Sequence, residues 1–134
     1  MTGSVQLHHV SVLVKDTAHA LDFYQGVLGL PVNPDRPDLG YPGAWLQLGE
    51  AQIHLLELPN PDPVADRPAH GGRDRHLALS VPAFEDVLQR LEADGVVVSR
   101  SRSGRAAAFC RDPDGNAVEL IAQPGQSSGS GSSP

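Results

Sequence analysis

Short runs of alternating polar and hydrophobic residues make up much of the first half of the chain, with a helical pattern between them. Within residues 7–14 a valine occupies every second position from Val10 onward, which predicts a strand that buries one face. Apolar residues then recur at helical spacing over 18–28, followed by a glycine suited to a left-handed helix end. Two short runs at 44–48 and 52–58 predict a pair of strands joined by a tight turn.

The same order of patterns begins again after a proline-rich segment. Residues 59–74 hold four prolines and two glycines, and we expect them to form a linker without structure of its own. Beyond it the pattern predicts strands over 75–81, 96–99, 106–111 and 117–122, and a helix that starts at Pro82 and buries Phe84, Val87, Leu88 and Leu91. Residues 124–134 contain only Gly, Ser, Pro and Gln and are expected to be disordered.

Each half therefore follows the order β-α-β-β-β, which indicates an α+β fold. We expect a single domain over residues 1–123, built from modules at about 7–58 and 75–122 that the linker 59–74 connects. An internal repeat of this size usually means two paired modules that bury a common face.

Both modules contain a histidine in the first strand and a glutamate in the last. His9 and Glu57 are 48 residues apart, and His76 and Glu119 are 43 residues apart. A carboxylate on an inward strand face is costly unless it is paired or bound to a cation, and two nearby carboxylates repel each other. One divalent metal would remove both problems, and imidazole with carboxylate suits Ni, Co, Zn, Mn or Fe better than Ca or Mg. We expect these four residues to hold such a metal and to leave positions open for substrate.

Strand parity helps to choose among the histidines. It places His9 on the face opposite the valines of its strand, whereas His8 falls with those valines. The strand that carries Glu57 separates its faces less cleanly, because Gln52 and His54 are polar and lie opposite Glu57. The remaining histidines lack a matching partner in the other half and are interpreted as structural or surface residues: His19, His54 and His70.

Composition and charge limit the partners. The chain of 134 residues has a net charge of −6, which argues against nucleic acid, and no apolar run is long enough for a membrane span. No signal peptide is visible and Cys110 is the single cysteine, so we expect a cytoplasmic protein with a small-molecule substrate. A local group of arginines is either solvated surface or an anion-binding rim: Arg100, Arg102, Arg105 and Arg111.

Three stretches carry a resemblance to a known superfamily: H-V-S-V-L-V-K-D with D-F-Y-Q-G-V-L-G-L over 9–30, H-L-A-L-S-V over 76–81, and D-P-D-G-N-A-V-E-L over 112–120. In this order they resemble the vicinal oxygen chelate superfamily, which includes glyoxalase I, fosfomycin-resistance enzymes and extradiol dioxygenases. The resemblance implies a cup-shaped mixed β-sheet formed by the two modules, with helices on the outside. It also implies a homodimer.

The chain most resembles short, bacterial-type glyoxalase I, a lyase that takes one His and one Glu from each module. This resemblance implies proton transfer through an enediolate on the hemithioacetal of a 2-oxoaldehyde, such as methylglyoxal, with a thiol such as glutathione. Glu119 would be the catalytic base, and Glu57 a metal ligand and second catalytic carboxylate. The residues expected to bind substrate are Ser11, Arg102, Arg105 and Phe109, although Phe109 fits plain core packing equally well.

Two other functions within the superfamily stay open. A fosfomycin-type thiol transferase needs two His and one Glu, which His9, His76 and Glu119 would supply. A non-catalytic protein that binds a drug or metabolite in the same cup needs no metal. Turnover and metal dependence distinguish these three hypotheses.

Overall fold

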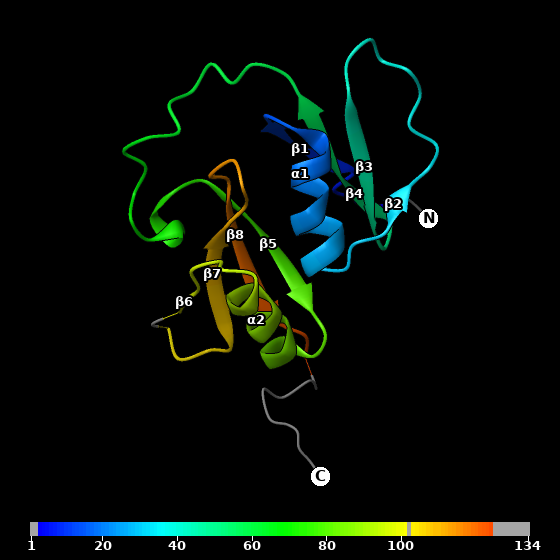
Figure 1. Ribbon diagram of the computed structural model, residues 1–134. Coiled ribbons are helices and arrows are strands. Elements are labelled where there is room, and N and C mark those ends of the chain that lie inside the picture. Colours follow the sequence, from blue (N-terminus) through cyan, green and yellow to red (C-terminus); the bar gives the residue numbers. More distant parts are fainter. Residues whose placement is uncertain (1–2, 102, 125–134) are drawn as a thin grey trace. The chain divides into compact units, whose positions relative to one another are not determined.

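The computed structural model describes residues 3–101 and 103–124 (Figure 1). The chain divides into two compact units, Met1–Pro61 and Asp62–Pro134, and the boundary falls inside the predicted linker. Each unit contains one four-stranded mixed sheet with a helical segment, in the order β-α-β-β-β. The predicted α+β class and the repeated order of elements are therefore confirmed. Of the predicted disordered tail, residues 125–134 lie outside the described residues.

The first unit consists of β1 (His9–Val14), α1 (Thr17–Leu21), the π-helical segment η1 (Asp22–Val27), β2 (Val32–Asn33), β3 (Gly43–Leu48) and β4 (Ala51–Glu57). Its strands lie in the order β1-β4-β3-β2, with β1 parallel to β4 and the other pairs antiparallel. The helical pattern over 18–28 is thus divided between an α-helical turn and a wider π-helical segment. The two-residue strand β2 is a fourth strand of this unit, in addition to the three that the sequence pattern locates.

The register of β1 against β4 decides which side chains share a face in the first unit. His9 pairs with Gln52, Ser11 with His54, and the last pair joins β1 to Glu57. The helix-facing side of the sheet contributes apolar residues to a core that also includes the helical segments: Val14, Ala20, Phe23, Tyr24, Leu46, Ile53 and Leu55. The opposite side carries the polar residues.

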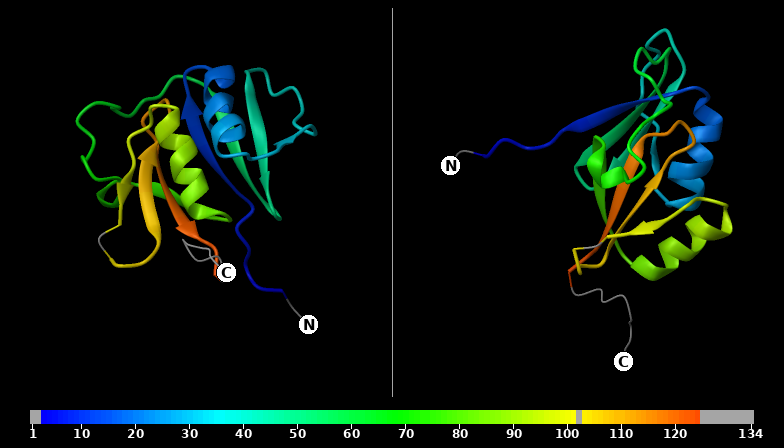
Figure 2. Two further views of the ribbon diagram at one scale, coloured as in Figure 1. Left: turned by 60° about the horizontal axis from the view of Figure 1, so that its bottom comes forward. Right: turned by 90° about the vertical axis from the view of Figure 1, so that its left-hand side faces the viewer.

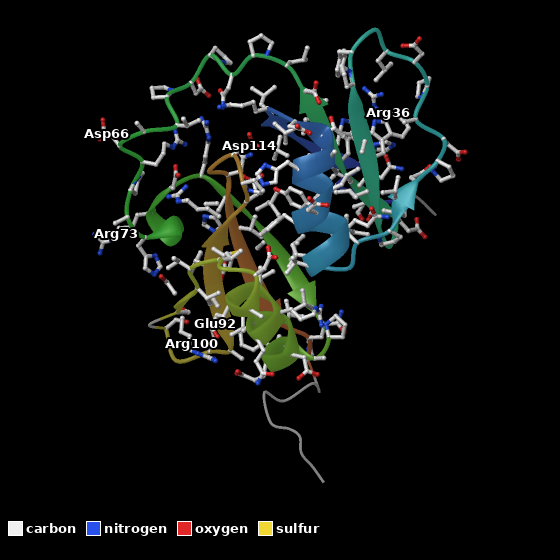
Figure 3. All side chains as sticks on the ribbon, viewed as in Figure 1. Arg36, Asp66, Arg73, Glu92, Arg100 and Asp114 are labelled. Atoms are coloured by element: carbon white, nitrogen blue, oxygen red, sulfur yellow. The ribbon has the colours of Figure 1, made fainter. Side chains whose placement is uncertain are left out.

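The second unit consists of η2 (Gly71–Arg73), β5 (His76–Val81), α2 (Phe84–Ala93), β6 (Ser99–Arg100), β7 (Ala107–Arg111) and β8 (Ala117–Ala122). Its order β5-β8-β7-β6 repeats that of the first unit, again with the first and last strands parallel. The 3-10 turn η2 lies in the segment predicted to be an unstructured linker, where Figure 3 also places Asp66 and Arg73. The expectation that this linker has no structure of its own is therefore wrong at its C-terminal end.

Helix α2 packs on one face of the second sheet and closes its core (Figure 2). All four residues of the predicted apolar stripe are buried: Phe84, Val87, Leu88 and Leu91. The helix begins at Phe84 rather than at Pro82, because Ala83 adopts a left-handed conformation with a φ of 49°. From the sheet, the alternate residues Leu79, Val118 and Leu120 meet this helix face, as strand periodicity predicts. Across the described residues no helix is both long and apolar enough to cross a membrane.

Burial of Cys110 generates a prediction about alkaline stability. This thiol is 4% exposed, and burial, reinforced by the Asp112 carboxylate, raises the pKa of Cys110 to about 12 from 9.0. The folded protein then holds the thiol proton more tightly than the unfolded chain does. The protonated thiol of Cys110 therefore contributes fully to the free energy of unfolding below pH 9.0, and this contribution is lost as the pH rises toward about 12.

We therefore expect the free energy of unfolding to fall more steeply above about pH 9 in the wild type than in Cys110→Ala. Urea denaturation of both proteins at neutral and alkaline pH measures the difference. Parallel pH profiles for the two proteins would contradict this account of Cys110.

Candidate functional site

His76 and Glu119 come together on the exposed face of the second sheet. His76 pairs with Ala117 across the β5–β8 ladder, so Glu119, two residues further along β8, lies on the same face. Nε2 of His76 is 3.3 Å from Oε1 of Glu119, and the side chains are 27% and 6% exposed respectively. The predicted pairing of these two residues in the second module is thus found in the structure.

A backbone contact orients the imidazole of His76. Its Nδ1 lies 2.9 Å from the carbonyl oxygen of Asp74, and because that oxygen can only accept, Nδ1 is the donor. In the neutral ring Nε2 then carries a lone pair that faces the Glu119 carboxylate. Two electron-rich groups that face each other are stabilised by a second proton on the imidazole or by a cation between or beside them. This arrangement, with the second ring nitrogen tied to a carbonyl, is the one that metal-binding histidines usually show.

Two arginines hold the segment that precedes His76. The Asp74 carboxylate accepts from Nη2 of Arg67 at 2.8 Å and from Nη1 of Arg111 at 2.9 Å. The hydrogen bonds from Arg67 and then Arg111 lower the pKa of Asp74 to about 2. Arg111 also donates to the carbonyl oxygens of Pro68 and Gly115. The sequence predicts either solvated surface or an anion-binding rim for Arg111, but this side chain is part-buried and fixes the backbone beside His76.

Arg105 occupies the other oxygen of the Glu119 carboxylate. Its Nη2 donates to Oε2 at 3.0 Å, although the Arg105 side chain is 61% exposed. Arg105 was predicted to bind substrate, and the structure instead shows it paired with the candidate metal ligand. Arg102, predicted for the same role, lies outside the described residues.

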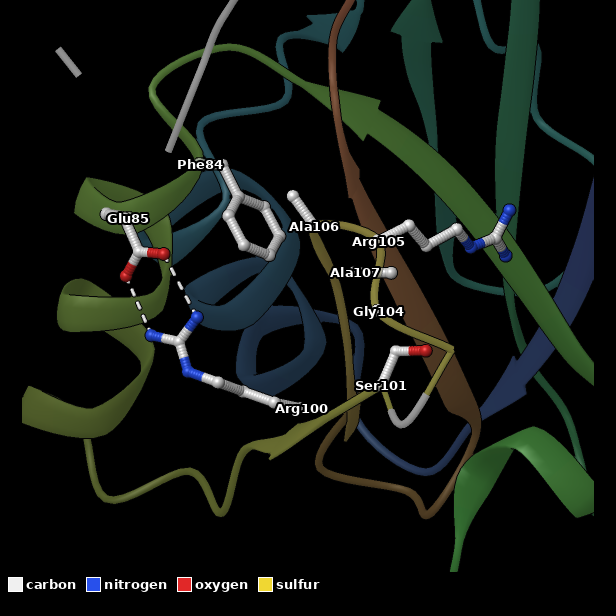
Figure 4. A pocket seen from close by; sticks show the side chains of 8 residues that line it. All are labelled: Phe84, Glu85, Arg100, Ser101, Gly104, Arg105, Ala106 and Ala107. Atoms are coloured by element: carbon white, nitrogen blue, oxygen red, sulfur yellow. Dashed lines mark hydrogen bonds and ion pairs between the residues drawn. The ribbon is translucent and has the colours of Figure 1, made fainter. Parts of the chain in front are cut away.

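Arg100 makes a separate ion pair on the rim of a pocket of about 260 Å³ (Figure 4). Its two terminal nitrogens donate to both oxygens of Glu85 at 2.7 and 3.0 Å. This bidentate pair lowers the pKa of Glu85 and raises that of Arg100. Arg105 also lines the pocket, but in Figure 4 its side chain points away from the Arg100–Glu85 pair.

Phe109 lies beside the His76–Glu119 pair and is 9% exposed. It pairs with Glu119 across the β7–β8 ladder, and its ring meets His76 edge-to-face, with centroids 5.4 Å apart. The ring of His70 covers it from the linker at 4.8 Å, and a Cβ on Gly72 would come within 3.1 Å of it. These contacts favour the core-packing alternative for Phe109 over a substrate-facing role.

In the first unit an aromatic stack surrounds His9. The rings of His9 and His54 are parallel, with centroids 3.9 Å apart, and the ring of Trp45 stacks on the other side of His54 at 4.5 Å. Nδ1 of His8 lies 2.8 Å from Nδ1 of His9, so one of these nitrogens donates to the other. Ser11, predicted to bind substrate, is exposed on the same sheet face and pairs with His54.

His54 is 8% exposed, and Nε2 lies 2.7 Å from Oε1 of Gln52. Desolvation lowers the pKa of His54, and the charges of His9, His8 and Arg36 lower it further. A neutral imidazole is the form that binds metal. The burial of His54 and its ring stacking agree with the structural role that the sequence suggests, and its contact with His9 also makes it a candidate ligand.

Glu57 does not join His9, contrary to the prediction. It is three residues beyond His54 on β4, which places it on the helix-facing side of the sheet. There its Oε1 accepts the backbone N–H of Thr17 at 2.8 Å, at the first residue of α1. That N–H has no partner inside the helix, and a carboxylate at a helix N-terminus is also favoured by the helix dipole. Glu57 is therefore a capping residue of α1.

The register shows which residue of the first unit corresponds to Glu119. In each unit the first strand begins with a histidine that pairs with a residue of the last strand. The candidate ligand lies two residues beyond that paired residue, and it is His54 in the first unit and Glu119 in the second. The sequence contains a signal for this match, because I-H-L-L at 53–56 and V-E-L-I at 118–121 both place one polar residue between aliphatic ones. Among the described residues no group of three or more His, Cys, Asp or Glu side chains is placed so that it could hold a metal ion. The candidate ligands form one pair in each unit.

Comparison with known proteins identifies the family. The sequence model of the Glyoxalase/Bleomycin resistance protein/Dioxygenase superfamily matches residues 6–120. The chain belongs to this superfamily. Glyoxylase I 4 of Arabidopsis thaliana is 33% identical over 121 residues, which cover 85% of this chain and 68% of that protein. A lactoylglutathione lyase of Escherichia coli O157:H7 is 30% identical, over 87% of this chain and 92% of that enzyme.

Solved structures of the superfamily share the fold. A structure named for the glyoxalase family, from Bacillus anthracis, has a TM-score of 0.73 at 26% identity and covers 92% of this chain and 99% of that one. TnmS3, an antibiotic binding protein from Streptomyces sp. CB03234, has a TM-score of 0.69 at 23% identity over 92% of this chain and 99% of its own. These two proteins differ in what their names describe, so the chemistry of this chain has to be argued from its own residues.

The capping role of Glu57 predicts a loss of stability in Glu57→Ala. Removal of the carboxylate leaves the Thr17 N–H without its acceptor and should cost about 1 kcal/mol of the free energy of unfolding. Glu50→Ala is the matched control, because Glu50 is exposed on the β3–β4 turn and its replacement makes the same change in net charge. Chemical denaturation measures both, and equal stability of the two variants would argue against a cap.

Proposed function

We propose that this superfamily member is a metal-dependent enzyme of the glyoxalase I class, which moves a proton between neighbouring carbons of a small substrate. The observation that carries the proposal is the contact of His76 Nε2 with Glu119 Oε1 at 3.3 Å, with Nδ1 committed to the Asp74 carbonyl. Relatives named lactoylglutathione lyase, at about 30% identity over most of the chain, support the reaction class.

The donor set suits a divalent transition metal such as Ni, Co, Zn, Mn or Fe. His76 offers Nε2 and Glu119 an oxygen, and the lowered pKa of His54 favours a neutral imidazole in the first unit. We propose His76 and Glu119 as ligands in the second unit, and His9 and His54 as ligands in the first. When bound, the metal would withdraw electron density from neighbouring substrate oxygens and acidify the adjacent C–H bond.

Glu119 is then the base of the proposed reaction. The sequence suggests two catalytic glutamates, Glu57 and Glu119. The Glu57 carboxylate accepts the backbone N–H of Thr17 at the start of α1, so Glu119 is the carboxylate available for proton transfer. It would take the proton from the hydroxyl-bearing carbon of a hemithioacetal and return it to the neighbouring carbonyl carbon. The hydroxyl proton passes to the former carbonyl oxygen, so the product is a 2-hydroxyacyl thioester with the same atoms as the substrate. The Asp74 carbonyl keeps His76 in the orientation that faces this carboxylate.

Substitution of Glu119 tests the proposal. Glu119→Gln should keep the fold but lower turnover by about 10²–10⁴-fold, because the amide cannot accept the substrate proton. The assay uses methylglyoxal with glutathione or another thiol, after metal analysis and after Ni, Co, Zn, Mn or Fe is added back. Glu57→Gln is the control, since it makes the same change on the helix-facing side, and it should retain turnover.

One observation favours a second candidate function, the non-catalytic binding of a planar drug or metabolite. The Trp45, His54 and His9 rings form a stacked series, and such flat faces bind planar aromatic molecules well. Under this hypothesis planar ligands raise the melting temperature, no metal restores turnover, and added metal leaves the melting temperature unchanged. That combination of results would reject the proposed enzyme.

The thiol, a homodimer and a cytoplasmic location stay predictions.

A further inference from the structure

The ion pair between Arg105 and Glu119 bears directly on metal binding. Glu119 is only 6% exposed, and its two oxygens have different partners, Nε2 of His76 on one side and Nη2 of Arg105 on the other. A buried carboxylate without a cation is unfavourable, so the guanidinium supplies the positive charge that the pair requires. A divalent ion at Glu119 would bind one or both of these oxygens.

We propose that Arg105 competes with the metal for Glu119 and thereby sets the metal affinity of the site. This inference rests on the proposed metal-binding role of His76 and Glu119. A metal at Glu119 and a guanidinium at 3.0 Å from the same carboxylate would repel each other, so metal binding displaces Arg105. Arg105 is suited to displacement because its side chain is 61% exposed and can move into water with little loss of packing.

The chain provides a matched control for this competition. Arg100 lies five residues earlier, is 60% exposed, and also pairs with a glutamate, Glu85, at 2.7 Å. Its carboxylate partner sits on α2 rather than on the face that carries His76. Loss of Arg100 and loss of Arg105 therefore change the net charge equally, while only the second frees a candidate ligand.

The experiment is a titration with Mn²⁺, in which the free ion is followed by its electron paramagnetic resonance signal. Arg105→Ala should bind Mn²⁺ more tightly than the wild type, by a factor on the order of fivefold, which corresponds to loss of one exposed ion pair. Arg105→Lys keeps a charge but loses the guanidinium fork, and its affinity should fall between the two. Arg100→Ala should bind as the wild type does. Circular dichroism verifies the fold of each variant, and Arg105→Lys carries the test if Arg105→Ala does not fold.

The outcomes separate this inference from the proposed function. Mn²⁺ binding by the wild type with an unchanged or weaker affinity in Arg105→Ala would overturn the competition and leave the metal site standing. Equal tightening in Arg105→Ala and Arg100→Ala would also overturn it, since general electrostatics would then explain the effect. No binding by any of the proteins would reject the metal site as well. Binding that appears only when Arg105 is replaced would support the competition in its strongest form.

Discussion

The parallel pairing of the first and last strands determines the chemistry of each unit, because its register decides which side chains share the open face of the sheet. In the second unit this register brings Glu119 beside His76. In the first unit it brings His54 beside His9 and turns Glu57 toward the helix. One geometric rule, applied twice, therefore yields an imidazole–carboxylate pair in one unit and an imidazole–imidazole pair in the other.

The His76–Glu119 pair is stabilised by nearby positive charge, and the surrounding residues determine which group supplies that charge. The Asp74 carbonyl fixes the proton of His76 on Nδ1, so the ring cannot relieve the carboxylate unless it takes a second proton. The two arginines on Asp74 keep that backbone segment in place, and a third, Arg105, reaches the carboxylate itself. These three arginines thus have two distinct physical roles, although they look alike in the sequence.

Much of the fold could be predicted from local patterns, because apolar residues recur at every second position in a strand and at every third or fourth position in a helix when one face is buried. The apolar stripe of α2 and the shared face of His76 and Glu119 follow from such spacing. Strand parity places His54 and Glu57 on opposite faces, but only the register against β1 shows which of the two shares a face with His9. The contact of Arg105 with Glu119 joins a loop to a strand, and such a contact leaves no periodic signal.

The metal affinities of two single variants test the account most directly. The register predicts that His54 is a ligand and that Glu57 is a helix cap. Calorimetric titration with Ni²⁺ should therefore show an affinity loss of more than about 10-fold in His54→Ala, the least expected for a lost ligand, and an unchanged affinity in Glu57→Gln. The opposite result, with the loss confined to Glu57→Gln, would contradict the register-based assignment of the site.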